Sequence, residues 1–203
     1  MTISRAALAA ILTLMLSGCI SLFPKVPPAQ LYRFGVEPAQ TQAAAVGGFN
    51  VQRLPITFTY AANGDRILTA DGTSTAYIAG ARWVAPAPSL FDEAESQAFQ
   101  NAQGPARLLR VGDAASAPVS LRLDVQAFEA RYENGPKAAP TVVVAVHAVL
   151  ISTLDRKVLG DEVFISRQPA ADNRVGAIVS AFDAAVGDVL GRIVDWTGRR
   201  AQA

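Results

Sequence analysis

Cys19 is the residue whose type and position are best suited to covalent chemistry. It is the only cysteine among the 203 residues, and it ends the run Leu16-Ser17-Gly18-Cys19. A cysteine thiolate is a good nucleophile, able to take up a diacylglyceryl group. Ser17 and Gly18 are small enough for the cleft of a peptidase that cuts directly before the cysteine. A lone cysteine excludes an internal disulfide, so modification of the thiol is the chemistry that this run favours.

The residues before Cys19 have the layout of a secretory signal peptide. Arg5 gives a short positive region, and the largely apolar run 6–16 is too short to cross a hydrocarbon core about 30 Å thick. Together with Leu16-Ser17-Gly18-Cys19 this resembles a bacterial lipoprotein box, which implies that Cys19 is lipidated and becomes the first residue of the mature chain. The alternative is an ordinary signal peptide with an incidental cysteine. Two acyl chains with an added N-acyl chain such as palmitate form a stable anchor, because a single chain holds only marginally. Ile20 stands where an Asp retains Gram-negative lipoproteins in the inner membrane, so it favours the outer membrane.

No other part of the sequence has the pattern of a catalytic or metal site. His147 is the only histidine and lies within the apolar run 141–154, which indicates a histidine satisfied within a sheet or core. There is no His/Cys cluster for a metal and no Gly-x-Ser-x-Gly, phosphate-loop or dinucleotide motif. We therefore expect no enzyme, no metal and no cofactor beyond the lipid on Cys19. A periplasmic hydrolase would have to depend on His147.

The composition is that of a folded domain without an electrostatic affinity for nucleic acid. It is 51% hydrophobic and 17% charged, too apolar for a disordered chain. Arg5 is the only charged residue of 1–18, so removing this segment lowers the formal net charge from +1 to zero. A neutral chain without a basic cluster argues against nucleic acid and against electrostatic membrane binding.

The spacing of apolar residues predicts a sheet with two helices. Alternation in 119–133 slips by one residue at Phe128, which predicts a β-bulge, and the nearly continuous apolar run 141–154 predicts a central strand. One helix is expected to begin at Ser89, with Asp92 completing its N-cap, and to end before Gly104. A long amphipathic helix is expected from Asp172 to about Trp196. The predicted strands are 31–34, 49–55, 66–69, 75–78, 119–133, 141–154 and 158–167.

These elements predict the fold class and the division of the chain. The last three strands are joined by short turns, so we expect an α+β, two-layer sandwich: an antiparallel β-meander sheet with two main helices packed on one face. Residues 1–18 are the predicted signal peptide and 19–29 the lipidated cysteine and a Pro-rich tether. Residues 30–197 form one predicted domain, and 198–203 a tail.

The order of these marks resembles the ABC-type transport auxiliary lipoproteins, the PqiC-like family of bacterial envelopes. The resemblance runs from Cys19 to about Trp196. After the lipoprotein box and the tether, the marks that carry it are Leu31-Tyr32-Arg33-Phe34, Val51-Gln52-Arg53-Leu54-Pro55, Arg66-Ile67-Leu68, the pair Arg82-Trp83, the strand pair around Asp155 and the C-terminal helix.

The resemblance implies an outer-membrane-anchored auxiliary protein that faces the periplasm. Its partner would be an MCE-domain (mammalian cell entry) protein of an ABC transporter that moves lipid between the membranes. Tyr77 and Trp83 are the candidates for exposed partner contacts; the alternative for Trp83 is a core anchor at the start of the helix. The alternative function is a structural or assembly lipoprotein, such as an outer-membrane protein chaperone or a peptidoglycan-linked adaptor. An exposed face of the last helix or strand would also support a homo-oligomer.

Overall fold

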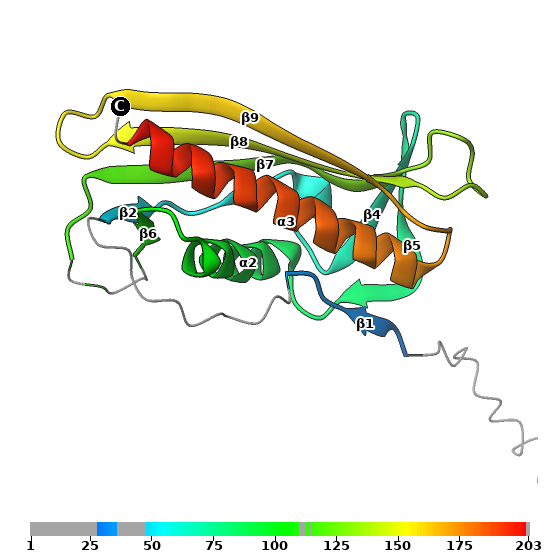
Figure 1. Cartoon of the computed structure of the whole chain (residues 1–203). Helices are drawn as coiled ribbons and strands as arrows, with labels where there is room; N and C mark the ends of the chain where they lie inside the picture. Colours follow the sequence, from blue (N-terminus) through cyan, green and yellow to red (C-terminus); the bar gives the residue numbers. More distant parts are fainter. Residues whose placement is uncertain (1–27, 36–47, 110–112, 114, 202–203) are drawn as a thin grey trace, which may run out of the picture.

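A computed structural model describes residues 28–35, 48–109, 113 and 115–201. Within these ranges the chain forms two α-helices, one short 3₁₀-helix and a nine-stranded sheet (Figure 1). The elements are β1 (Gln30–Tyr32), β2 (Phe49–Arg53), β3 (Thr57–Phe58), η1 (Tyr60–Ala62), β4 (Arg66–Asp71), β5 (Ser74–Trp83), α2 (Ala87–Asn101), β6 (Ala106–Leu108), β7 (Val119–Arg131), β8 (Thr141–Ser152), β9 (Val158–Pro169) and α3 (Val175–Arg200).

Strand β7 is the strand around which the sheet is built. Along one edge it pairs antiparallel with β8, and β8 pairs antiparallel with β9. Along its other edge, three short strands pair with β7 in the parallel sense, one after another: β2 near its start, β3 in its middle and β4 near its end. Strand β6 then extends the sheet from β2, and β5 and β1 extend it from β4.

The sheet is therefore mixed, which corrects the expected antiparallel meander. The meander is present in β7–β8–β9. In addition, β4 and β5 form a hairpin, and Gly72 in its turn has a φ of +57°. The parallel pairings with β7 were missed because β2, β3 and β4 are only 5, 2 and 6 residues long. Strands this short carry too little alternation to reveal a partner far away in the sequence.

The predicted bulge in the long strand is present. The register between β7 and β8 shifts between Val125 and Ala127, so the extra residue lies just before the predicted slip at Phe128. Before the shift Leu121, Leu123 and Val125 point into the core, and after it Phe128 and Ala130 do so. The bulge thus keeps a 13-residue strand facing one core along its whole length.

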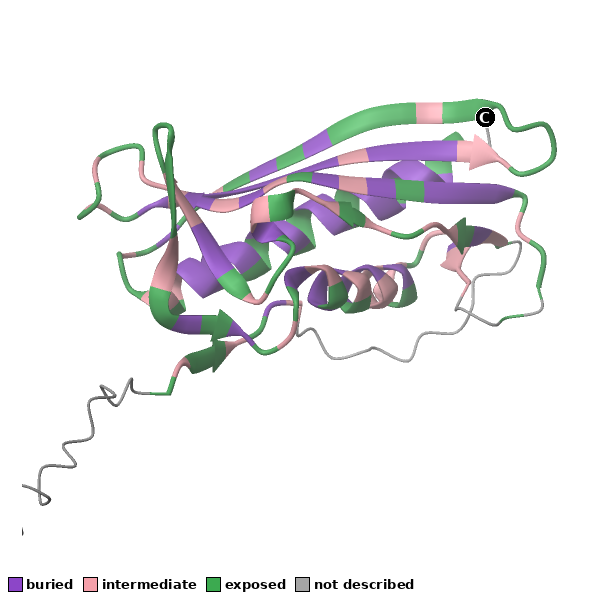
Figure 2. Cartoon of the chain, turned by 180° about the vertical axis from the view of Figure 1, so that it is seen from behind, coloured by how far each residue is buried: buried purple, intermediate pink, exposed green. Residues whose placement is uncertain are grey.

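Helix α3 covers one face of β8 and β9. It packs against Phe164, whose ring centroid lies 5.7 Å from that of Trp196. On the opposite face β9 is largely exposed (Figure 2), whereas Val143, Ala145 and Val149 of β8 are buried. The helix is shifted relative to the prediction: it begins at Val175 and continues to Arg200, so part of the predicted tail 198–203 is helical.

Helix α2 begins earlier than expected, so Ser89 is not its N-cap. The helix starts at Ala87 after Pro86, and Ser89 lies in its first turn. Pro88 explains the difference, because a proline is well tolerated where backbone N–H groups have no helical partner. The large apolar side chains of the helix, Leu90, Phe91 and Phe99, are buried.

Gly160 marks a close approach of α3 to the sheet. A Cβ atom added there would lie 2.6 Å from Cζ2 of Trp196, which is 2% exposed. We expect Gly160→Ala to lower the free energy of unfolding by about 1–3 kcal/mol through overpacking, measured by urea denaturation. Gly176→Ala is the matched control: no atom lies within 4 Å of its added Cβ and it is helical, so stability should hold or rise. Equal stability of the two variants would contradict this packing.

Candidate functional site

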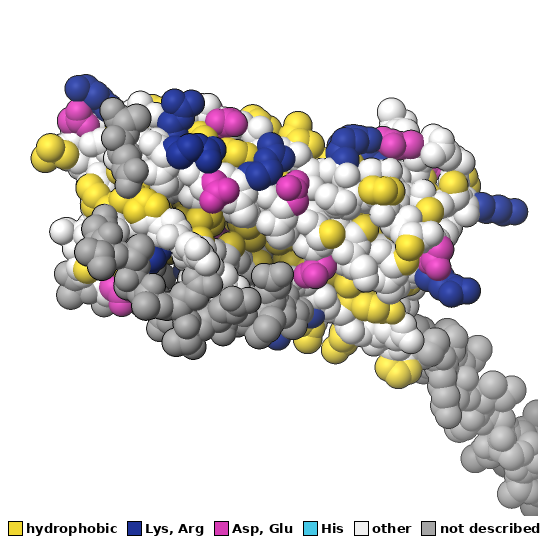
Figure 3. Space-filling model, viewed as in Figure 1, with side chains coloured by type: hydrophobic (Ala, Val, Ile, Leu, Met, Phe, Trp, Pro, Cys, Tyr) yellow, Lys and Arg dark blue, Asp and Glu magenta, His cyan; other side chains and the backbone are white. Residues whose placement is uncertain are grey.

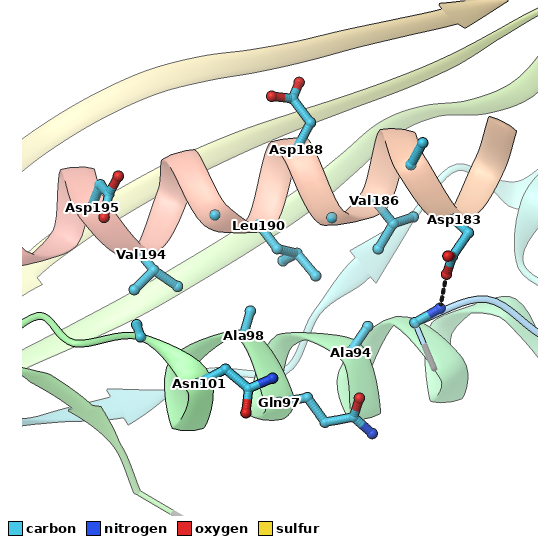
Figure 4. Close-up of a pocket in the computed structure, with 15 residues that line it drawn as sticks. Ala94, Gln97, Ala98, Asn101, Asp183, Val186, Asp188, Leu190, Val194 and Asp195 are labelled. Carbon is cyan, nitrogen blue, oxygen red and sulfur yellow. Dashed lines mark hydrogen bonds between the residues drawn. The ribbon is translucent and has the colours of Figure 1, made fainter. Parts of the chain in front are cut away.

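A groove between α2 and α3 is the candidate functional site. The two helices run side by side in the same direction, and the hollow between them has a volume of about 530 Å³ (Figure 4). Val186, Leu190 and Val194 of α3 point toward α2, where Ala94 and Ala98 face them (Figure 4). Hydrophobic side chains accordingly follow the hollow beside α3 in the space-filling view (Figure 3). The floor of the groove is apolar, and short side chains keep it open.

One end of the groove is closed by the chain that follows β1. Gly35 has a φ of +71° and donates its backbone N–H to Asp183 Oδ1 of α3 at 2.6 Å (dashed in Figure 4). A Cβ on Gly35 would lie 2.6 Å from the Cβ of Ala94 in α2. Only glycine therefore fits between the two helices here, both for its backbone conformation and for the space available.

Two glycines widen the groove on the side of α3. Gly187 and Gly191 are exposed, line the hollow and have no atom within 4 Å of an added Cβ. They lie one helical turn apart, so they leave one continuous strip of α3 without side chains. The sequence patterns above assign these glycines no role, although their spacing of four residues indicates that one side of the helix is bare.

The rim of the groove is acidic. Asp188 and Asp195 of α3 line it, the carboxylate of Asp188 pointing away from α2 (Figure 4), and the amides Gln97 and Asn101 lie on the side of α2. Asp188 has Arg192 as a distant ion-pair partner, 3.7 Å away. An apolar floor below exposed carboxylates suits an apolar segment that carries positive charges.

Beneath α2, on the side facing the sheet, Glu95 is a buried acid. It is fully buried, and neither of its carboxyl oxygens has a hydrogen-bond partner among the described residues. Its Oε2 lies 3.7 Å from Arg53 Nη1, which is much closer to Asp92 Oδ1 at 2.6 Å. Burial raises the pKa of Glu95 to about 8; Arg53 opposes this effect and Asp92 adds to it. Glu95 is therefore protonated at neutral pH, and Arg53 serves as the partner of Asp92.

The structure places the two predicted contact residues differently. Trp83 is 2% exposed and packs edge-on against Phe34 and Phe182 at ring distances of 5.0 and 5.3 Å, so the prediction of an exposed contact was wrong and the core alternative is correct. Tyr77 is half-buried: its hydroxyl donates to the carbonyl of Ala61, and the guanidinium of Arg66 lies 3.7 Å above its ring. Neither residue lines the groove.

His147 is a sheet histidine with one ring nitrogen paired. It lies in β8 on the solvent side, and its Nε2 is 2.7 Å from Asp161 Oδ1 of β9. No group of three or more metal-ligating side chains is found among the described residues. In the same part of the chain no helix is long and apolar enough to cross a membrane. The predicted lipidation site, Cys19 with Leu16, Ser17 and Gly18, lies outside the described residues.

The sequence places this chain in a known class of protein. The family described as "ABC-type transport auxiliary lipoprotein component" matches residues 32–194, so the chain belongs to that family. The match spans the described fold from the end of β1 to near the end of α3. No curated protein sequence matches the chain.

Solved structures share the fold. A crystal structure of a protein from Xanthomonas campestris has a TM-score of 0.74 at 21% identity, covering 86% of this chain and 97% of that chain. The crystal structure of an uncharacterized protein has a TM-score of 0.65 at 9% identity, covering 83% of this chain and 98% of the other. At such low identity these similarities establish the fold alone.

The buried Glu95 makes stability depend on pH. Its pKa of about 8 in the folded chain lies above the ordinary value of 4.5, so the folded protein keeps a proton that the unfolded chain loses. The stabilisation is complete below pH 4.5 and declines as pH rises toward 8, by up to about 1.4 kcal/mol per pH unit. Glu95→Gln removes this loss. In thermal unfolding, the melting temperature of the variant should therefore rise relative to that of the wild type as the pH increases from 5 to 8.

Glu93→Gln is the control for this measurement. Glu93 lies on the same helix but is half-exposed and pairs with Arg33 at the surface. Its pH profile should follow that of the wild type. Parallel profiles of Glu95→Gln and the wild type would show that Glu95 is ionised in the folded chain.

Proposed function

We propose that this chain is a non-catalytic docking lipoprotein, anchored in the outer membrane through Cys19, that binds an MCE-type partner of an ABC transporter involved in intermembrane lipid transport. Membership of the auxiliary lipoprotein family supports the link to a transporter. Among the described residues there is no group of metal ligands, and the single histidine is paired with Asp161 on an open sheet face. The conclusion rests chiefly on the groove, which has the form of a site for a chain segment.

The groove has the features of a helix- or peptide-binding site. Its floor is a row of aliphatic side chains from two helices, its glycine strip admits a close backbone, and Asp188 and Asp195 lie on its rim. An amphipathic segment would bury its apolar face on this floor, and Lys or Arg residues at the border of that face would pair with the carboxylates of the rim. The closure at Gly35 and Asp183 leaves one end blocked, so an occupant would be held in one position along the groove.

Ile20 after the lipidated cysteine supports the outer membrane as the site of anchoring. We expect the wild type to incorporate labelled palmitate and to sediment with the outer membrane in a sucrose gradient. Cys19→Ala should abolish the label, and Ile20→Asp should keep the label but move the chain to the inner-membrane fraction. A labelled Ile20→Asp chain that stays with the outer membrane would contradict sorting by this residue.

The groove is tested by filling it. We expect Gly191→Leu to reduce recovery of the MCE-domain protein at least tenfold when the lipidated chain is pulled down from membranes, because the new side chain occupies the open strip. The melting temperature should not fall, since no atom lies within 4 Å of the added Cβ.

Gly176→Leu is the matched control for the pull-down. It introduces the same side chain in the same helix, in open space and outside the groove, so binding should be retained. Equal recovery with both variants would exclude the groove as the docking site. Recovery of an outer-membrane barrel protein or of peptidoglycan, without any MCE-domain protein, would instead favour the assembly function.

A further inference from the structure

Strand β9 forms a long unpaired edge of the sheet. It has 12 residues and pairs with β8 and with no other described strand. It follows the upper border of the molecule in Figure 1 and is largely exposed in Figure 2. A long edge strand is a template for pairing with another chain, which proteins usually prevent by shortening, bending or covering it.

The edge also exposes large hydrophobic side chains. Val158, Val163 and Ile165 are 59%, 47% and 51% exposed. They point to the face of the sheet that α3 does not cover, where Val158, Val163 and Ile165 lie opposite Ile151, His147 and Ala145 of β8. Most other large hydrophobic side chains in the strands of this sheet are buried, so β9 is where apolar surface remains open to another chain.

The backbone shows which groups of β9 are free to pair. The backbone N–H of Ala170 donates to the carbonyl of Pro140 at 2.9 Å, so these two residues form a hydrogen-bonded pair. Along an antiparallel ladder, hydrogen-bonded pairs alternate with pairs that are not hydrogen-bonded. Even-numbered residues of β9 therefore bond to β8, whereas the N–H and C=O groups of the odd-numbered residues from Asp161 to Arg167 point outward. Arg192 of α3 confirms this direction, because its Nη1 donates to the carbonyl of Ile165 at 3.0 Å.

We propose that β9 pairs with β9 of a second copy of this chain, antiparallel and centred on Phe164, so that two sheets become continuous across a two-fold axis. In this register Asp161 of each chain lies opposite Arg167 of the other, and Val163 lies opposite Ile165. The backbone N–H and C=O groups of all four residues point outward from the sheet edge, and all four residues are exposed. Opposite charges and apolar residues are thus matched across the strands on one face.

The charges select this register over its neighbours. Shifting one strand by two residues relative to the other, in one direction, places Asp161 opposite Ile165. The same shift in the other direction places Val163 opposite Arg167. Either shift sets a charge against an apolar side chain and loses the ion pairs. The hydrogen bond from Arg192 to Ile165 must open, and the N–H of Val163 from the second copy takes its place.

The test uses charge reversal in the full lipidated chain in detergent, with mass measured by sedimentation at several protein concentrations. The wild type should be a concentration-dependent dimer. Asp161→Arg and Arg167→Asp should each weaken the dimer about tenfold, because two symmetry-related pairs turn from attractive to repulsive. The double variant Asp161→Arg/Arg167→Asp should restore it.

Folding and register are checked separately. Asp161 contacts His147 and Arg167 contacts Glu133 within one chain, so each variant must also retain its melting temperature within a few degrees. His147→Ala is the matched control: it breaks the internal contact without changing the edge, and should dimerise normally. Oxidation of Val163→Cys/Ile165→Cys should trap a covalent dimer.

Three results would overturn the proposal. These are a wild type that stays monomeric at every concentration, a dimer that charge reversal leaves unchanged, and a double variant that is not rescued although it is folded. A monomer that instead binds a strand of a different protein at β9 would assign the edge to that partner.

Discussion

The ring of Phe128 is the contact through which the separate parts of this fold meet. It lies 4.8 Å from Phe182 of α3, 5.2 Å from Phe34 after β1, 5.7 Å from Phe58 of β3 and 6.2 Å from Trp83 of β5. These residues are far apart in the sequence, and the strands β1 and β3 next to Phe34 and Phe58 have only 3 and 2 residues to pair. Large aromatic side chains bury the most area per residue, so one cluster joins the N-terminal strands, the central strand and the last helix.

The bulge in β7 is what brings Phe128 into that cluster. In an uninterrupted strand with Val125 facing the core, Phe128 would point to solvent. The extra residue between Val125 and Ala127 reverses the alternation, and Phe128 becomes 1% exposed. A local backbone irregularity therefore determines where α3 packs, and with it the position of the groove between α3 and α2.

The sequence predicted what is local and missed what arises between elements. The strands of the β7–β8–β9 meander, the bulge and α3 were predicted because each carries a long, regular pattern in its own residues. For Trp83 the sequence allowed both an exposed contact and a core anchor, because its burial depends on Phe34 and Phe182, which no local pattern connects to it. The groove was missed for the same reason: its walls belong to two helices, and Gly187 and Gly191 show their purpose only when α2 lies alongside.

Helix α3 is the common wall of both proposed interaction surfaces. Gly191 faces the groove, while its neighbour Arg192 reaches the other way to the edge carbonyl of Ile165. The groove and the β9 edge lie on different sides of α3, so a partner segment and a second copy do not compete for the same space (Figure 1). Strand β1, where the tether enters the domain, lies at the end opposite the β8–β9 turn (Figure 1). Pairing through β9 would then join two grooves and two lipid anchors in one assembly, and a partner with two docking segments would gain affinity from effective concentration without any new contact.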